Sequence, residues 1–324
     1  MRRSAVTIAV LLTLSVLATQ AQDKVLLRHK FTPDERLTYT MDAGGDVNMI
    51  VTDKATGKTQ PFQFQMKMRM GVSQETKSVD NAGVGEVNMQ YGTMAMDMTL
   101  PGMGQMHMDL DPAQGTMTMG GQAQPLPVPL TAMLSQGITL KITPLGKVES
   151  IQGGEGLQKV LVQAGMRGMD LQQMTQQNQI SFPEQPVGPG DTWVQKVKMP
   201  LPGAGVAQEM TTTYRFEGFQ DFGGRKCAKL AATMSLPLAP GSTVEMPTPG
   251  QENLKVTLSD MSLDGKGDVL FDPEAGKLVH SGAALTMSMV TRTKGTVLVN
   301  GAQQAVDVET NIQRMNMNVA MNVQ

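Results

Sequence analysis

The chain has 324 residues, 29 methionines, one cysteine and a net charge of −2. This length suits one large all-β domain or two ordinary domains, and an apolar fraction of 40% is adequate for real cores. The nearly balanced charge, without a stripe of Lys and Arg interleaved with aromatics, argues against nucleic acid as a partner. The single cysteine, Cys227, excludes an internal disulfide framework.

The N-terminus predicts export. Arg2 and Arg3 precede an apolar run over 8–17 and a small-residue stretch that ends at Ala21, as in a cleaved signal peptide. The run is shorter than the roughly 18 to 20 residues that span a bilayer, and no other stretch comes close. We therefore expect a signal peptide over 1–21 and a soluble mature chain, without a transmembrane segment, in the periplasm or outside the cell.

The first half of the mature chain, 22–150, alternates apolar and polar residues. The stretch "FQFQMKMRM" over 62–70 is the clearest case, and a turn at Gly83 and Gly85 separates it from the next alternating run. A break in phase between Tyr91 and Met94 is typical of a tight turn or a bulge. Strict alternation predicts antiparallel strands with one wet face, arranged here as a β-meander.

The middle of the chain has a different period. Apolar residues recur at three-to-four spacing from Gly156 to about Gln177, which predicts an amphipathic helix. Gly165 and Gly168 weaken its centre. We assign 151–181 to this helix and its connector.

Alternation returns over 182–324 and predicts a second meander. One strand ending at Val299, a turn at Asn300–Gly301 and a return strand containing Val306 and Val308 fit a hairpin. Each half begins with a similar turn motif and contains a second turn motif at nearly the same distance along the sequence, which suggests a duplication. The alternative is chance, because turns generally require these residue types. Whether the halves form two sheets or one curved sheet stays open. The expected class is mainly β, a β-dominated α+β fold of antiparallel curved sheets with one amphipathic helix.

Three motifs occur in a fixed order, "GKVESIQGG" from Gly146, a helical stretch, and "PVGPGDTW" ending at Trp193. In this respect the chain resembles an uncharacterised family of exported bacterial proteins with a Gly-Lys-x-x-x-Ile-x-Gly strand, a helix and a Gly-Asp-x-Trp turn. More distantly, a curved sheet with a covering helix is similar in architecture to the periplasmic lipoprotein-carrier half-barrels, which hold acyl chains on the concave face. The first resemblance implies no activity, and a fold does not determine a function.

Catalytic motifs are missing from the sequence. It has no G-x-S-x-G, no H-E-x-x-H and no phosphate-binding glycine loop, and its histidines, His29, His107 and His280, are far apart. We expect a protein that is not an enzyme, with a hydrolase of no recognisable motif as an alternative, because scattered acids can meet in space.

Two single residues have both a structural and a functional interpretation. Trp193, at the start of a strand, is expected to anchor the core, with ligand stacking as the alternative. Cys227 shares strand parity with Arg225 and Lys229, which would lower its pKa if all three faced one way, but a small, partly buried residue is the favoured interpretation.

The methionines have three explanations: core packing, a surface for an apolar partner, and Cu(I) binding. Met adapts to irregular gaps and to ligands of variable shape, whereas thioether sulfur selects Cu(I). The candidate ligand-binding residues are Phe62, Phe64, Met66, Met68, Met70, Met94, Met96, Met98 and Trp193. The candidate metal ligands are Met103, Met106, His107 and Met108.

The metal prediction carries a geometric condition. On a regular strand His107 would point away from Met106 and Met108, so metal binding needs a loop here or ligands from a neighbouring strand about 5 Å away. The preferred function is non-catalytic binding of an apolar, lipid-like small molecule or of an envelope protein. A periplasmic Cu(I)-binding protein is the alternative, and no other cofactor is expected.

Overall fold

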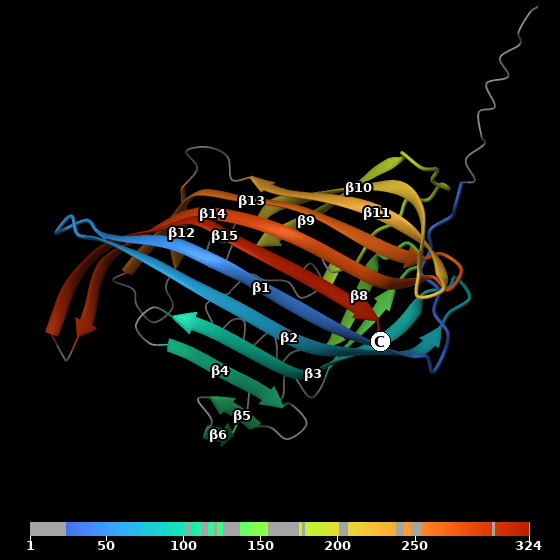
Figure 1. Cartoon of the computed structure of the whole chain (residues 1–324), viewed down its shortest axis with the longest axis horizontal. Helices are drawn as coiled ribbons and strands as arrows, with labels where there is room; N and C mark the ends of the chain where they lie inside the picture. The colour runs from blue at the N-terminus through green and yellow to red at the C-terminus, as the bar shows by residue number, and fades with distance from the viewer. Residues whose placement is uncertain are drawn as a thin grey trace, which may run out of the picture.

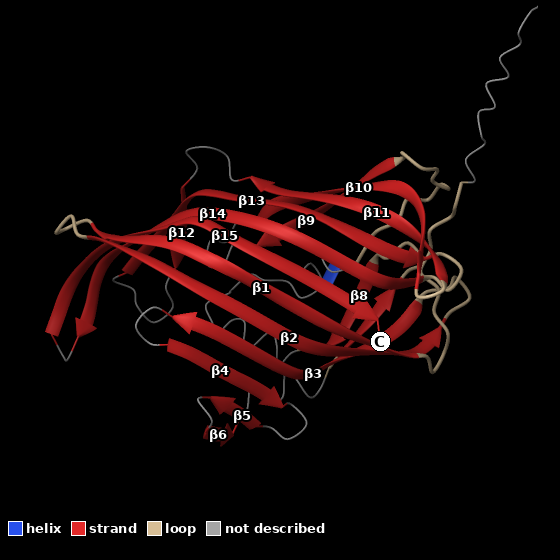
Figure 2. Cartoon of the chain, viewed as in Figure 1, coloured by secondary structure: helices blue, strands red, loops and turns tan. Residues whose placement is uncertain are grey.

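The computed structural model describes eleven ranges of the chain: 24–100, 104–111, 116–119, 122–125, 137–154, 175–176, 179–200, 207–237, 243–247, 254–299 and 302–323. The predicted signal peptide lies outside them. So does nearly all of the predicted helix, of which only Thr175 and Gln176 are described, in helical conformation (Figure 2). The described part is almost all β, as the predicted mainly β class requires, and the helix stays a prediction because nearly all of it lies outside the described residues.

The described residues form 15 strands in a single antiparallel sheet. The first half supplies β1 (Arg36–Asp53), β2 (Thr59–Val79), β3 (Gly85–Leu100), β4 (Gly104–Asp111), β5 (Thr116–Met119), β6 (Gln122–Pro125), β7 (Ile138–Ile142) and β8 (Val148–Gly153). The second half supplies β9 (Thr192–Pro200), β10 (Ala207–Phe222), β11 (Arg225–Pro237), β12 (Thr243–Pro247), β13 (Leu254–Asp272), β14 (Lys277–Val299) and β15 (Ala302–Val323).

The two halves join through the first and the last strand of the chain, which lie in the middle of the sheet. The strand order is β6-β5-β4-β3-β2-β1-β15-β14-β13-β11-β10-β9, so β1 pairs with β15 and makes the two meanders one continuous sheet. Figure 1 shows these strands side by side as a curved sheet, with β7 and β8 behind it. The question that the sequence leaves open is thus decided in favour of one sheet. The proposed duplication and the domain limits stay predictions.

Local details of the alternation pattern are confirmed. Gly83 has a positive φ of 79° in the turn before β3, a conformation that glycine adopts without strain. The register of β2 against β3 shifts between Tyr91 and Met94, which is the predicted bulge. Strands β14 and β15 pair antiparallel up to Val299 and Ala302, as the predicted hairpin requires, although residues 300–301 themselves lie outside the described ranges.

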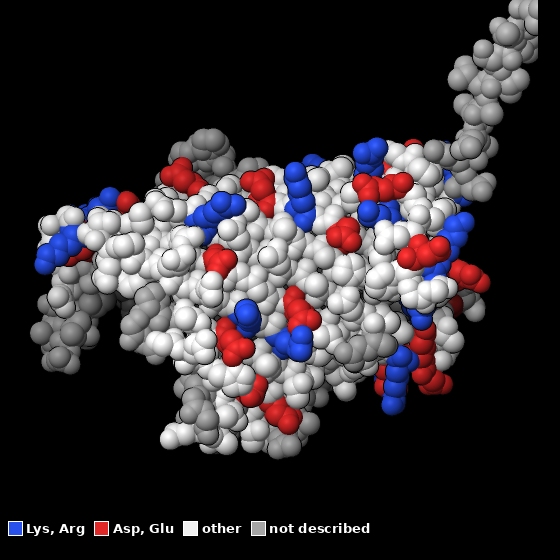
Figure 3. Space-filling view, in the orientation of Figure 1, with Lys and Arg blue, Asp and Glu red and all other residues white. Residues whose placement is uncertain are grey.

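Cross-strand pairing places side chains of like polarity on the same side. Antiparallel partners share a face, so residues 39, 41 and 47 of β1 lie on the same side as their partners on β2 and β15. We call this side the apolar face. The other side, the polar face, carries ion pairs such as that of Arg69 Nε with Asp42 Oδ1, 2.6 Å apart. Charges of both signs are scattered over the side of the sheet that Figure 3 shows.

The centre of the apolar face is closely packed at the junction of the two halves. A Cβ atom at Gly45 in β1 would overlap the backbone oxygen of Asn316 in β15. Only glycine tolerates such an approach of backbones. Glycine at this position therefore permits the close approach of β1 and β15 at the pairing that joins the meanders.

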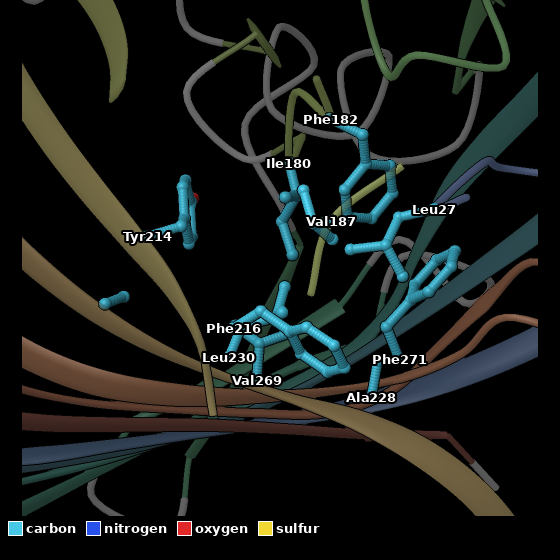
Figure 4. Packing of buried hydrophobic residues seen from close by; sticks show 11 residues of the cluster. Leu27, Ile180, Phe182, Val187, Tyr214, Phe216, Ala228, Leu230, Val269 and Phe271 are labelled. Atoms are coloured by element: carbon cyan, nitrogen blue, oxygen red, sulfur yellow. The ribbon is translucent and has the colours of Figure 1, made fainter. Parts of the chain in front are cut away.

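One end of the apolar face is covered by two segments from distant parts of the sequence. The N-terminal segment, residues 24–31, and the return segment, residues 179–187, are joined by an isolated antiparallel bridge between Val25 and Val187. Their apolar side chains pack on β10, β11 and β13 in one buried cluster (Figure 4). We call this the aromatic cluster; it consists of Leu27, Ile180, Phe182, Val187, Tyr214, Phe216, Ala228, Leu230, Ala232, Val269 and Phe271.

Candidate functional site

Methionines of three neighbouring strands line up on the apolar face. In the register of β2, β3 and β4, Met66 is opposite Met98, which is opposite Met106. The next row contains Met68, Met96 and Met108, and a third row pairs Met70 with Met94. We call these eight residues the methionine patch. Directly opposite residues have Cβ atoms about 4.5 to 5.5 Å apart, so the methionine side chains of each row lie side by side.

The apolar face continues on both sides of the methionine patch. On β1 and β15 it carries Met41 opposite Met321 and Val47 opposite Met315. Phe62 and Phe64 extend it along β2, where they pair with Met49 and Val47. An apolar surface therefore runs from β4 across the centre of the sheet to the aromatic cluster.

Most of the methionine patch is only half-buried. Met70 is 9% exposed and packs with Tyr39 and Val72, whereas Met66, Met68, Met96 and Met98 are partly exposed and Met106 is 38% exposed. Ordinary core side chains are almost fully withdrawn from water, and large exposed apolar patches usually mark a binding surface. The patch thus differs from a closed core in the degree to which its side chains are covered.

The predicted ligand-binding residues divide into two places. Phe62, Phe64 and the predicted methionines 66, 68, 70, 94, 96 and 98 all lie on the apolar face of β2 and β3. Trp193 lies at the other end of the sheet, packed against the aromatic cluster. The structure therefore brings together eight of the nine predicted residues and separates Trp193 from them.

Trp193 fastens the return segment to the sheet. Its indole Nε1–H donates to the backbone oxygen of Ser181 at 2.8 Å, and its ring stacks on Tyr214 at 5.5 Å between centroids. The neighbouring buried Gln195 accepts from the Ser181 N–H at 3.0 Å and donates to the Gln179 oxygen at 2.9 Å. Burial raises the pKa of Tyr214 to about 12. These contacts give Trp193 a structural position, in agreement with its interpretation as an anchor.

His29 joins the two covering segments to the sheet. Its ring lies 5.0 Å from Phe182 and 5.5 Å from Phe271, and its Nε2 is 3.2 Å from the Ile180 backbone oxygen. Burial lowers the pKa of His29 to about 4, although the Ile180 contact raises it, and the nearby Lys277 ammonium adds to the lowering. The imidazole is therefore neutral at pH 7 and donates this hydrogen bond without a charge.

The predicted metal ligands are divided between the two faces of β4. Met106 and Met108 pair with Met98 and Met96, whereas His107 pairs with Asp97 on the polar face. Because successive side chains of a regular strand point to opposite sides, His107 does not meet the two methionines. Met103 lies outside the described residues. Copper binding stays a prediction, and in the register Met98 and Met96 of β3 lie opposite Met106 and Met108, with Met119 of β5 opposite Met108 on the other side.

The ring of His107 is held by two carboxylates instead. Nδ1 is 2.6 Å from Asp97 Oδ1, and Nε2 is 2.8 Å from Asp109 Oδ2. The hydrogen bond with Asp97, followed by that with Asp109, raises the pKa of this exposed imidazole. Both ring nitrogens are thus occupied. In the described residues no group of three or more His, Cys, Asp and Glu side chains is placed to hold a metal ion.

A hollow of about 450 Å³ lies on the polar face, behind the methionine patch. Its floor contains Gly71 and Ala95, and its walls include Thr40, Arg69, Asp109 and Thr118. Small residues at the bulge of β3 leave this space between longer side chains. Its lining of hydroxyls and paired charges contrasts with the thioethers on the other side of the same strands.

Cys227 has a different environment from that of a reactive thiol. Its side chain is buried on the polar face of β11, packed with Leu270 and Val279. Burial raises the pKa of Cys227, as does Asp272, and Arg225 offsets this only in part. Alternation along β11 places Arg225 and Lys229 on the same face as Cys227. Burial outweighs the lowering by Arg225, so the pKa of Cys227 is raised.

Six further methionines belong to the apolar face: the predicted metal ligands Met106 and Met108, and four for which the sequence predicts no specific role, Met41, Met315, Met317 and Met321. The pairing puts all six on the apolar face with the methionine patch. Their period-two spacing already indicated a shared face within each strand. The alignment of strands into rows needed the register.

No family model and no curated protein sequence matches the chain. Among solved structures, one described as lipid-protein interactions in lipovitellin is 11% identical with a TM-score of 0.42. The matched region covers 91% of this chain and 25% of the lipovitellin chain. A DUF1329 family protein from Desulfovibrio piger ATCC 29098 is 9% identical with a TM-score of 0.12. The matched region covers 87% of this chain and 83% of that protein. The chain thus spans about a quarter of the lipovitellin chain, and at these TM-scores neither likeness carries an argument.

Proposed function

We propose that this protein binds an apolar, lipid-like molecule on the methionine patch without transforming it. The observation that carries the proposal is the set of half-buried methionine rows on one continuous apolar face. Covering these side chains with a ligand removes apolar surface from water, which is favourable by about 25 cal/mol per Å².

The composition of the patch suits a chain-like ligand of variable shape. Met has an unbranched side chain and a polarizable sulfur, so a surface of methionines adapts to different apolar partners. Each row crosses three strands, and Phe62 and Phe64 extend the surface along β2. A flexible acyl chain can follow such an open surface of a curved sheet, and adaptable methionine side chains can close around it.

Binding without chemistry is favoured by the side chains present. The methionine patch contains no titratable group, and the nearest charged side chains on the same strands, Lys67, Asp97 and Asp109, lie on the polar face. General acid–base or nucleophilic catalysis needs such a group within reach of the substrate. With the signal-like N-terminus, the proposed setting is outside the cytoplasm; among the described residues, no helix is both long and apolar enough to cross a membrane.

The test is binding of a fluorescent fatty acid, cis-parinaric acid, to the purified protein. Met68→Glu and Met96→Glu place a carboxylate in the middle row and are expected to weaken binding at least tenfold, because burying an unpaired charge is costly. Lys67→Glu is the matched control, since it changes the charge of an exposed neighbour of Met68 on the other face of β2.

Unchanged affinity in both methionine variants, or equal loss in Lys67→Glu, would contradict the proposal. Native mass spectrometry of protein purified from its own cells gives an independent readout. A lipid-sized mass that is present in the unaltered protein and missing from Met68→Glu is the expected result.

A further inference from the structure

The outer row of the methionine patch has the donors of a soft metal site. Met66, Met98 and Met106 come from three successive strands and lie directly opposite one another, with Met98 in the middle. Neighbouring strands are about 5 Å apart, so Met66 and Met106 lie about 10 Å from each other on either side of Met98. Flexible Met side chains can lean inward from both sides and bring three sulfurs to a point above Met98. Thioethers select Cu(I) over harder cations.

Exposure favours this row over the two beside it. Met106 is 38% exposed, which leaves its sulfur accessible to an incoming ion. In the innermost row Met70 is 9% exposed and packs with Tyr39 and Val72, and β4 contributes Leu110 in place of a third methionine. Met106 is thus the most exposed residue of the methionine patch, and the row to which it belongs is the most open to solvent.

The surroundings of the row select against hard cations. Asp97 and His107 are the carboxylate and the imidazole next to this row in sequence. Both lie on the polar face, where they are hydrogen-bonded to each other at 2.6 Å. Magnesium and calcium require oxygen ligands, and zinc in proteins takes thiolate, imidazole or carboxylate. A site of three neutral thioethers offers none of these.

We propose that Met66, Met98 and Met106 form a Cu(I) site with three thioether ligands. This site retains Met106 from the predicted metal residues and replaces His107 with methionines of β2 and β3. It uses three residues of the proposed lipid-binding patch but does not rest on lipid binding, because coordination needs the sulfurs and not an apolar ligand.

The experiment is anaerobic titration of the purified protein with Cu(I) against the chromogenic chelator bathocuproine disulfonate. One equivalent of Cu(I) is expected to be retained, with an X-ray absorption spectrum showing sulfur ligands only. Met98→Leu is expected to weaken retention at least tenfold, since it leaves two donors in the row. Met94→Leu, the matched control on the same strand, is expected to retain the ion.

Met106→Leu changes an exposed side chain, so it should not disturb the fold even if Met98→Leu does. It is expected to show the same loss of Cu(I) retention. Full retention in both variants, an equal loss in Met94→Leu, or nitrogen or oxygen ligands in the spectrum would each overturn the proposal. Because fatty-acid binding to Met98→Leu can be measured separately, failure of this site and failure of the lipid proposal are distinguishable.

Discussion

The aromatic cluster and the methionine patch occupy the same apolar face of one sheet but differ in what covers them. In the aromatic cluster, Phe216 and Phe271 are fully buried beneath the N-terminal and return segments. In the methionine patch, Met66 and Met98 are half-buried and lie opposite each other, with no covering segment described above them. The first region is thus a rigid core and the second an adaptable surface, although alternation in the sequence is the same in both.

The largest expected effect tests whether burial separates the two regions. Phe271→Ala should lower the free energy of unfolding by about 3 to 5 kcal/mol, because it removes a fully buried ring and leaves a cavity. Phe64→Ala, on the half-buried side, should cost less than half as much. Urea unfolding measures both, and equal losses would contradict the distinction.

The second effect is a pH dependence of the free energy of unfolding that comes from His29, beside the aromatic cluster. The pKa of His29 is about 4 in the folded protein and about 6.5 in the unfolded chain. The unfolded chain therefore binds a proton first as the pH falls, and stability is lost below about 6.5. Between pH 7 and pH 5 the loss from this group should be about 2 kcal/mol.

Unfolding of His29→Gln at the same two pH values checks this effect. Glutamine keeps a donor for the Ile180 oxygen but does not titrate, so the variant should lose about 2 kcal/mol less than the unaltered protein over this interval. His107→Gln is the control, because that imidazole is exposed and its pKa is raised. An unchanged pH slope in His29→Gln would show that other groups cause the loss.

A smaller effect concerns the attachment of the return segment. Trp193→Phe keeps an aromatic ring against Tyr214 but removes the donor to the Ser181 oxygen. The expected cost is about 1 to 2 kcal/mol, that of an acceptor left without its partner. Hydrogen exchange should show faster exchange at residues 179–187 and no change at β2 and β3. Equal changes in both regions would mean that the two ends are not separately stabilised.

The smallest effect is expected in the methionine patch. Met96→Leu conserves volume at a half-buried position, so its cost should be well under about 1.5 kcal/mol. Thermal unfolding of this variant beside Leu230→Met, a similar exchange in the fully buried aromatic cluster, measures the difference. A larger cost at Met96 than at Leu230 would make the patch a closed core and remove the argument for a binding surface.

Much of the fold is predictable because period-two alternation is a local property. Phe62 to Met70 share a face within β2 whatever pairs with that strand, and the bulge after Tyr91 is visible as a break in phase. Pairing partners are not local. Met98 lies opposite Met66 and Met106 because of the register of β2, β3 and β4. Tyr39 pairs with Val323, near the other end of the chain, because β1 and β15 join the two halves.

Burial is likewise beyond what alternation determines. Cys227 has the spacing of a residue beside Arg225 and Lys229, yet it is buried and its pKa is raised because Leu270 and Val279 from two other strands pack on it. His29 has no motif at all, and its lowered pKa results from rings brought by the return segment and β13. In both cases the neighbours are distant in sequence.

By itself the sequence determined the strands, their two faces and the abundance of methionine on one of them, since each depends on residues a few positions apart. Tertiary structure alone decided that both meanders form one sheet, that methionines of three strands align into rows, and that one end of the apolar face is covered while the methionine patch is half-buried. The physical reason is that register and burial depend on segments distant in the chain, such as residues 24–31 and 179–187, whose meeting no local pattern encodes.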